Sequence, residues 1–296
     1  MEEVFPDRAT RTYVHRALGY CLTGEVREQA WWFAYGEGAN GKSVLLDTVS
    51  SVLGDYACAV NPDTFRAHNH AQPNQYQLAG LRGVRLIQAP EMDEDTPIAE
   101  GMLKAVTGNR TVAARVPYGM YFDLPVTFKV WVAGNHRPTV KGTDLGMWRR
   151  VRVVPFEATF REEQRDRDLL ASLRAEYPGI LAWLVRGCLD WQRHGLAVPP
   201  GMKAAVEDYR QSQDFARPFL DECCILGPGR RVRTGLLSAR YRVWCAEQRI
   251  KPLNMFQFAD RIRAIPGTDQ YQSKGYAWYK GISIREIPAL DLVDTL

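Results

Sequence analysis

Residues 36–43 read GEGANGKS and fit the phosphate-binding pattern G-x-x-x-x-G-K-[ST]. In such a loop the glycines let the backbone turn its N–H groups toward a phosphate, with the positive end of a helix behind them. Lys42 would reach the β- and γ-phosphates, and the hydroxyl group of Ser43 would complete the coordination shell of a Mg²⁺ ion. The chemistry expected from these residues is the binding and hydrolysis of a nucleoside triphosphate.

The segments on both sides of this loop are those needed to hold it. Residues 30–35 form a short apolar run typical of a buried strand, and residues 44–54 have apolar side chains at helical spacing and end at a glycine. The order strand, loop and helix distinguishes a nucleotide site from an ordinary glycine-rich turn. We therefore expect ATP and Mg²⁺, with nucleotide contacts from Gly36, Gly38, Ala39, Asn40, Gly41, Lys42, Ser43 and Val44.

An acidic side chain at the end of a neighbouring strand is the second requirement for hydrolysis. Residues 84–89 have strand character and are followed by an acidic run. Glu91 comes first after this strand, so it is the expected catalytic acid and, with Ser43, the expected metal ligand; Asp93 is the second choice. The same acids would also suit a surface turn.

Polar side chains flank two further predicted strands. Asn135 follows residues 126–133 and could sense the γ-phosphate or hold the attacking water, although asparagine is also a common turn former. Arg149 and Arg150 stand directly before residues 151–156. They suit simple salt-bridge formers or, in a ring-shaped ATPase, a pair from which one arginine reaches the γ-phosphate of the neighbouring subunit.

Between these segments, residues 115–123 have a Pro-Tyr-Gly centre with apolar flanks, which predicts a β-hairpin. Arg115 and Tyr118 could hold single-stranded nucleic acid through charge and base stacking. A structural hairpin that covers the edge of the sheet would have much the same residues.

The order of six blocks carries a resemblance to one family. The blocks are GEGANGKS, RLIQAPE, LKAVTG at residues 103–108, AARVPYG, KVWVAGNHRP and GTDLGMWRRVRVVPF. From about residue 12 to 285 the chain resembles the superfamily-3 helicase module of phage and plasmid primase-helicases, relatives of the poxvirus primase-helicase. It departs from the family at residues 107–110, which read TGNR where relatives often have TGGD.

The resemblance implies an ATP-dependent replicative DNA helicase of a phage, prophage or plasmid. Such proteins are homo-hexameric rings expected to move 3′→5′ along single-stranded DNA, to open forked DNA, and to work with a primase domain or partner. By position, Glu91 is then the motif-B acid, Asn135 the sensor, Arg149 or Arg150 the finger, and residues 115–120 the pore hairpin. An ATPase that loads or remodels another replication protein, or a nucleotide-regulated origin-binding protein, remains as an alternative.

The expected fold is α/β, an AAA+-like P-loop NTPase sheet with flanking helices and a small C-terminal winged-helix domain. Residues 1–29 would be a helical segment equivalent to a shortened collar, residues 30–226 the ATPase with its helical lid, residues 230–286 the winged helix, and residues 287–296 a tail. A linker is expected at residues 227–229. The chain is either a fragment of a longer primase-helicase or a stand-alone helicase.

The predicted C-terminal domain is strongly basic. Between Arg230 and Arg285 there are twelve Lys and Arg against three Asp and Glu, a net charge of +9, whereas the whole chain carries only +4. This density suggests contact with nucleic acid. Arg261, Arg263 and Lys274 are the expected DNA contacts, although a winged helix that binds a protein partner is also compatible.

Composition excludes several other classes of protein. The 296 residues include no apolar stretch long enough to span a membrane, and the N-terminus lacks the pattern of a signal peptide. Six cysteines show no metal-ligand spacing, and two of them are adjacent, so reduced thiols are expected. These features predict a cytoplasmic protein without a membrane partner, and the family resemblance implies a bacterial host cell.

Overall fold

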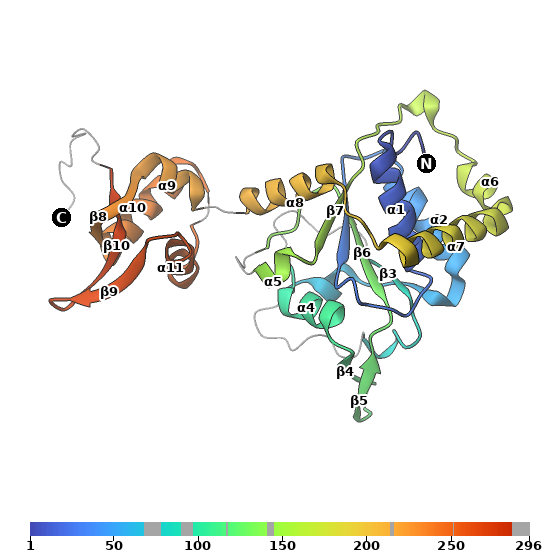
Figure 1. Ribbon diagram of the computed structural model, residues 1–296, viewed down its shortest axis with the longest axis horizontal. Helices are drawn as coiled ribbons and strands as arrows, with labels where there is room; N and C mark the ends of the chain where they lie inside the picture. Colours follow the sequence, from blue (N-terminus) through green and yellow to red (C-terminus); the bar gives the residue numbers. More distant parts are fainter. Residues whose placement is uncertain are drawn as a thin grey trace. The chain divides into compact units, whose positions relative to one another are not determined.

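The computed structural model describes residues 1–67, 78–89, 97–116, 118–140, 145–213, 216–250 and 252–285. The chain forms two compact units, Met1–Arg210 and Gln211–Leu296. The first unit holds the phosphate-binding loop and the second holds the basic segment, so each is described separately (Figure 1).

A five-stranded parallel sheet is the centre of the first unit. Its strands are ordered β2-β3-β6-β1-β7 and all pairings are parallel. Both faces of the sheet are covered, which explains why its strands read as nearly continuous apolar runs. The strands are β1 (Trp31–Tyr35), β2 (Ala57–Ala59), β3 (Leu86–Ala89), β6 (Lys129–Gly134) and β7 (Val151–Pro155).

Helices cover the two faces, and alternate strand residues divide the core between them. Trp31 and Phe33 of β1 belong to one hydrophobic cluster, together with residues of the helix Glu100–Gly108. Trp32 and Ala34 belong to the hydrophobic cluster on the other face. The helices are α1 (Arg8–Tyr20), α2 (Lys42–Leu53), α4 (Glu100–Gly108), α5 (Leu145–Trp148), α6 (Leu169–Ala175), α7 (Tyr177–His194) and α8 (Pro200–Ser212), with short 3-10 helices at Gly54–Tyr56, Pro62–Phe65 and Glu162–Gln164. A parallel sheet with flanking helices fits a P-loop-type fold, which confirms the α/β prediction at this level.

The first helix is packed closely against α7. A Cβ atom added to Gly19 would lie 2.2 Å from the backbone nitrogen of Cys188, and one added to Gly187 would lie 2.3 Å from the carbonyl oxygen of His15. Two glycines therefore let the helix backbones approach each other. Helix α1 lies within the first unit and contributes Val14 and Leu18 to its core, and the equivalence of residues 1–29 to a shortened collar stays a prediction.

The second unit is built on a three-stranded antiparallel sheet, ordered β8-β10-β9. Helices α9 (Arg217–Cys223), α10 (Thr234–Glu247) and α11 (Met255–Arg263) share its apolar core, and the strands are β8 (Cys224–Arg233), β9 (Asp269–Ser273) and β10 (Tyr276–Ile284). The expected linker at residues 227–229 is wrong, because these residues lie inside β8. Their glycines and proline suggested a break, but the preceding and following residues pair with β10.

Two expectations about the chain as a whole can be compared with the structure. Within the described ranges, the helices are all too short or too polar to cross a lipid bilayer. The six cysteines are free thiols, as expected from their spacing.

Candidate nucleotide-binding site

The phosphate-binding loop connects the end of β1 to the start of α2, as predicted. Gly41 caps α2 with φ +85°, a left-handed conformation that glycine adopts without strain. Gly36 is required for a different reason, because an added Cβ atom would lie 2.3 Å from the carbonyl oxygen of Phe156. The loop is thus shaped by one conformational and one steric constraint, both met by the glycines of the motif.

Lys42 is the centre of the site. Its side chain is buried, and the Nζ atom donates hydrogen bonds to Oδ1 of Asn135 at 2.9 Å and to Oδ1 of Asn40 at 3.2 Å. It also donates to the carbonyl oxygens of Gly36 and of Glu37, the latter at 3.3 Å. The described partners of the ammonium group are neutral oxygens, and phosphate oxygens can take their place at the first turn of a helix.

Asn135 is brought to this position by the order of the strands. It follows β6, which lies beside β1, and Tyr35 is in register with Gly134. Because the strands are parallel, their carboxyl ends meet at one edge of the sheet. The predicted sensor residue and the predicted phosphate-binding lysine therefore touch.

The predicted acids Glu91 and Asp93 lie outside the described residues. The strand before them, β3, pairs with β6 and ends at the same edge of the sheet as Asn135. Gln88 of this strand is joined to α2, since its Nε2 atom donates to Asp47 at 2.8 Å and its Oε1 atom accepts from Ser50 at 3.0 Å.

Arg149 and Arg150 lie at the amino-terminal ends of the parallel strands, whereas the predicted phosphate-binding loop lies at the carboxyl-terminal ends. The backbone N–H of Trp31, at the start of β1, donates to the carbonyl oxygen of Arg150 at 2.9 Å. Arg150 is buried and donates to the carbonyl oxygen of Gly146, whereas Arg149 is exposed and reaches Gln29 at 3.5 Å. The pair is therefore not brought to Lys42 of the same chain.

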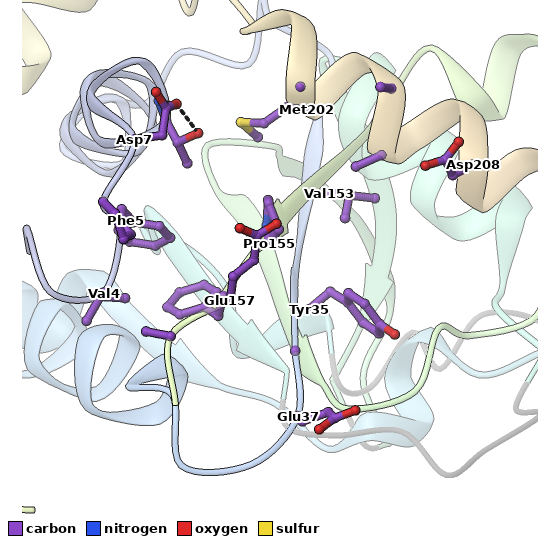
Figure 2. A pocket seen from close by; sticks show the side chains of 18 of the residues that line it. Val4, Phe5, Asp7, Tyr35, Glu37, Val153, Pro155, Glu157, Met202 and Asp208 are labelled. Carbon is purple, nitrogen blue, oxygen red and sulfur yellow. Dashed lines mark hydrogen bonds between the residues drawn. The ribbon is translucent and has the colours of Figure 1, made fainter. Parts of the chain in front are cut away.

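A pocket of about 730 Å³ opens beside the loop (Figure 2). Tyr35 and Glu37 line it from the loop side, Phe5 from the segment before α1, and Met202 and Asp208 from α8. Further lining comes from the end of β7 and the residues after it, including Pro155 and Glu157, and from Asp7 and Thr10. The pocket thus combines apolar walls with several carboxylates, next to the place where a phosphate would bind.

Asp7 is held in an ionised state at one side of this pocket. Hydrogen bonds from the side chain and backbone of Thr10, each at 2.7 Å, lower the pKa of its carboxyl group. The same bonds cap the first turn of α1. Asp7 therefore fixes the helix that borders the pocket.

Arg137 also lines the pocket, and the sequence reasoning did not select it. Its guanidinium group lies 4.7 Å from the ring centroid of Tyr35 and 5.6 Å from that of Tyr209. Burial raises the pKa of the Tyr209 hydroxyl, which donates to the carbonyl oxygen of Pro138. Arg137 stands two residues after Asn135, so an arginine just beyond the end of the sensor strand was the available signal.

The predicted hairpin is present as β4 (Thr111–Arg115) paired with β5 (Tyr121–Pro125), and it projects from the sheet in Figure 1. Tyr118 at the turn is 105% exposed and Met120 is 86% exposed. Arg115 donates to the carbonyl oxygen of Gly119 at 2.8 Å and lies over the Tyr121 ring. The tip is thus aromatic and exposed, while the arginine is engaged within the hairpin.

Two of the predicted DNA contacts of the second unit lie on α11, and the third lies at the turn between β9 and β10. Arg261 donates to the carbonyl oxygen of Gln213 at 3.2 Å, and Arg263 pairs with Asp260 at 2.7 Å. Lys274 lies at the turn between β9 and β10 with φ +49° and is exposed. Arg261 and Arg263 are therefore engaged within α11 and its surroundings, whereas Lys274 is on the sheet.

Comparisons with known proteins give this arrangement a context. Residues 34–150 match the model of a family described as "Family of unknown function (DUF5906)". A protein of frog virus 3 named "Putative helicase 022R" is 30% identical over 264 residues, which are 81% of this chain and 27% of that protein. One of Acanthamoeba polyphaga mimivirus, also named "Putative helicase", is 27% identical over 243 residues, which are 75% of this chain and 25% of that protein.

A protein of African swine fever virus named "Putative primase" is 24% identical over 155 residues, which are 51% of this chain and 16% of that protein. The chain spans about a quarter of the length of the first two relatives. Among solved structures, the apo C-terminal region of NrS-1 shares the fold with a TM-score of 0.56 at 11% identity, over 95% of this chain and 74% of that one. The chain is thus a homologue of proteins named as helicases and primases in large DNA viruses, and the resemblance to the superfamily-3 helicase module of primase-helicases is confirmed.

Proposed function

We propose that the chain is an ATP-hydrolysing DNA helicase module. The observation that carries this proposal is the contact between Lys42 and Asn135 behind a glycine loop at the carboxyl edge of a parallel sheet. The names of the viral relatives support the same class of activity. Phosphoryl transfer depends mainly on positioning and charge stabilisation, and these residues supply both.

In this proposal the triphosphate lies on the loop, with Lys42 on its β- and γ-phosphates. Ser43 and Glu91 would hold Mg²⁺, which would supply positive charge to offset the charge that develops during phosphoryl transfer. The pocket beside the loop would receive the base and ribose, since its apolar walls suit a purine ring and its carboxylates suit amino and hydroxyl donors. Arg137 would face the phosphates from the pocket side.

The arginine finger would come from a neighbouring copy of the chain. Arg149 and Arg150 lie at the amino-terminal ends of the strands, and the loop lies at the carboxyl-terminal ends. Neither arginine would therefore serve the site of its own chain. Arg149 is the better candidate because it is exposed, whereas Arg150 is buried against Gly146. An AAA+-like homo-hexamer with sites between subunits would satisfy this geometry.

DNA would pass along the exposed tip of the β4–β5 hairpin. Tyr118 offers an unobstructed ring for base stacking, and Met120 extends the apolar surface. The 3′→5′ direction, the winged-helix character of the second unit and the association with a primase belong to the proposal as well. A phage, prophage or plasmid source in bacterial cytoplasm stays a prediction, although relatives in DNA viruses are compatible with a mobile element.

The test is turnover of ATP with and without single-stranded DNA, followed by unwinding of a forked duplex. We expect DNA to stimulate hydrolysis, Lys42→Ala to abolish it, and Tyr118→Ala to keep basal hydrolysis while losing stimulation and unwinding. Stimulation without unwinding by the wild-type chain would instead support a loader or remodeller. Full hydrolysis by Lys42→Ala would overturn the proposed site.

A further inference from the structure

The sheet of the second unit has two chemically different faces. Val232 and Tyr279 point into the apolar core formed with α10 and α11, and both are buried. Successive side chains on a strand point to opposite faces, so the neighbours of these residues lie on the other face. That second face carries polar and aromatic side chains.

The strand register defines this outer surface. Arg233 of β8 is opposite Trp278 of β10, which is opposite Tyr271 of β9. Arg231 is opposite Lys280 in the next row, and Tyr276 lies two residues before Trp278 on the same strand. We call these side chains the basic aromatic face: Arg231, Arg233, Tyr271, Tyr276, Trp278 and Lys280.

Contacts between cations and rings hold this face together. The guanidinium group of Arg233 lies 4.1 Å from the ring centroid of Tyr276 and 5.4 Å from that of Trp278. The guanidinium group of Arg231 lies 5.6 Å from the Trp278 ring. Planar cations and aromatic rings are thus stacked across two neighbouring strands, in an arrangement that is largely set before any ligand arrives.

The charge of the face favours a polyanion. It has three cations, Arg231, Arg233 and Lys280, and the register brings one carboxylate beside them, Asp269, which pairs with Lys280 at 3.0 Å. Helix α11 offers less positive charge to a polyanion, because Arg263 is paired with Asp260 and the exposed Phe256 is apolar.

We propose that the basic aromatic face binds single-stranded DNA, with bases stacked on Tyr276 and Trp278 and phosphates held by Arg231 and Arg233. This inference rests on the proposed function only for the identity of the polymer as DNA. Residues two apart on a strand are about 7 Å apart, so the two rings can take neighbouring bases. A duplex keeps its bases stacked on one another, so the rings select a single strand.

A hollow of about 380 Å³ adjoins the face and gives room beside Tyr276 for a sugar or base. Its lining is Arg233, Thr234, Gly235, Leu236, Ala239, Tyr276 and Ala277. Arg233 and Tyr276 therefore belong both to the stacked surface and to a concave site, which makes them the residues to test first.

The test is fluorescence anisotropy of the full chain with a labelled oligothymidylate of about twelve nucleotides, measured without ATP. We expect Tyr276→Ala to weaken binding roughly tenfold and Tyr276→Phe to restore it, because stacking needs the ring and not the hydroxyl. Arg233→Ala should weaken binding. It should also make the slope of log binding constant against log salt concentration shallower by about one. Arg242→Ala on α10 removes the same charge elsewhere on the unit and should leave the affinity within about twofold of wild type.

Unchanged affinity in both Tyr276→Ala and Arg233→Ala would overturn the inference, as would equal weakening by Arg242→Ala or tighter binding of a blunt duplex. Because no nucleotide is present, this outcome is independent of ATP hydrolysis. If the substitutions in the basic aromatic face abolish binding but DNA still stimulates ATP hydrolysis, the face and the helicase site act separately. If the face binds DNA but the chain does not hydrolyse ATP, this inference holds and the proposed helicase function fails.

Discussion

The Nζ atom of Lys42 lies 2.9 Å from Oδ1 of Asn135, across 93 residues of sequence. The contact exists because β6 is inserted beside β1, so that the residue after one strand meets the helix that follows the other. A phosphate group that pairs with the Lys42 ammonium group would break its hydrogen bond to the Asn135 side-chain amide. Binding of the triphosphate would therefore be coupled to the position of the group expected to orient the attacking water.

This coupling predicts opposite effects of two substitutions at one position. Asn135→Ala removes one hydrogen-bond partner of Lys42, so ATP should bind at least as well while turnover falls by about 10²-fold. Asn135→Asp adds a carboxylate that pairs with the ammonium group and repels phosphate, so ATP affinity should fall as well. Titration with a fluorescent ATP analogue and steady-state hydrolysis measure both; equal affinities for the two variants would contradict the coupling.

The two arginines before β7 should separate into a catalytic and a structural residue. Arg149→Ala should leave the melting temperature near wild type and reduce turnover by about 10³-fold, because its exposed guanidinium group would act on a neighbouring chain. Arg150→Ala should lower the melting temperature, because it removes a buried side chain packed against Gly108.

Mixing experiments then test whether Arg149 acts in trans. Wild-type chains mixed with Arg149→Ala chains should lose activity faster than the mole fraction of the variant rises. A strictly proportional loss would mean that each chain completes its own site.

The glycine loop offers a matched pair of substitutions. Gly36→Ala puts a methyl group 2.3 Å from the carbonyl oxygen of Phe156, whereas Gly38→Ala finds no atom within 4 Å among the described residues. We expect Gly36→Ala to distort the loop and weaken ATP binding by more than tenfold, as overpacking costs about 1–3 kcal/mol. Gly38→Ala should bind ATP nearly normally; the reverse order, measured by calorimetry, would show that the loop changes shape on binding.

Lys129 at the start of β6 predicts a dependence of stability on pH. It is 2% exposed, donates to the carbonyl oxygens of Thr23 and Thr127, and lies over the Tyr20 ring; burial lowers its pKa to about 8. The fold therefore penalises the charged form. This penalty is complete below pH 8 and is relieved as pH rises from about 8 toward the unfolded value of 10.5.

Between pH 8 and 9 the free energy of unfolding should gain about 1 kcal/mol from this residue, and Lys129→Met should lose that gain. The window ends at pH 9 because burial raises the pKa of the buried thiols, that of Cys21 from 9 to about 11, and their contribution to stability has the opposite sign. Urea unfolding of both proteins across this range is the measurement. Parallel curves for wild type and variant would mean that Lys129 does not titrate there.

Local patterns predicted the loop, the hairpin and the strands β1, β3, β6 and β7, because each is defined by neighbouring residues such as the glycines before Lys42, but they missed β2 and β8. They also predicted that Asn135 ends a strand. Local patterns alone could not show that Arg149 and Arg150 lie at the end of the strands away from the loop, since this depends on β7 running parallel to β1. Arg137 was missed because its stacking on Tyr35 and Tyr209 joins distant segments. The linker prediction at Gly227 and Gly229 was wrong for a similar reason, because pairing of β8 with β10 overrides the local turn preference of these residues.

The close crossing of α1 and α7 at Gly19 and Gly187 has a consequence for synthesis on the ribosome. The His15 ring reaches the carbonyl oxygen of Trp183, 168 residues later, so the first helix emerges long before its binding partner exists. Until then the side of α1 that α7 covers would be open to water, which would favour aggregation of the nascent chain. Completion of the first unit therefore waits for a late segment, and a nascent chain released before residue 187 would lack the surface against which α1 packs.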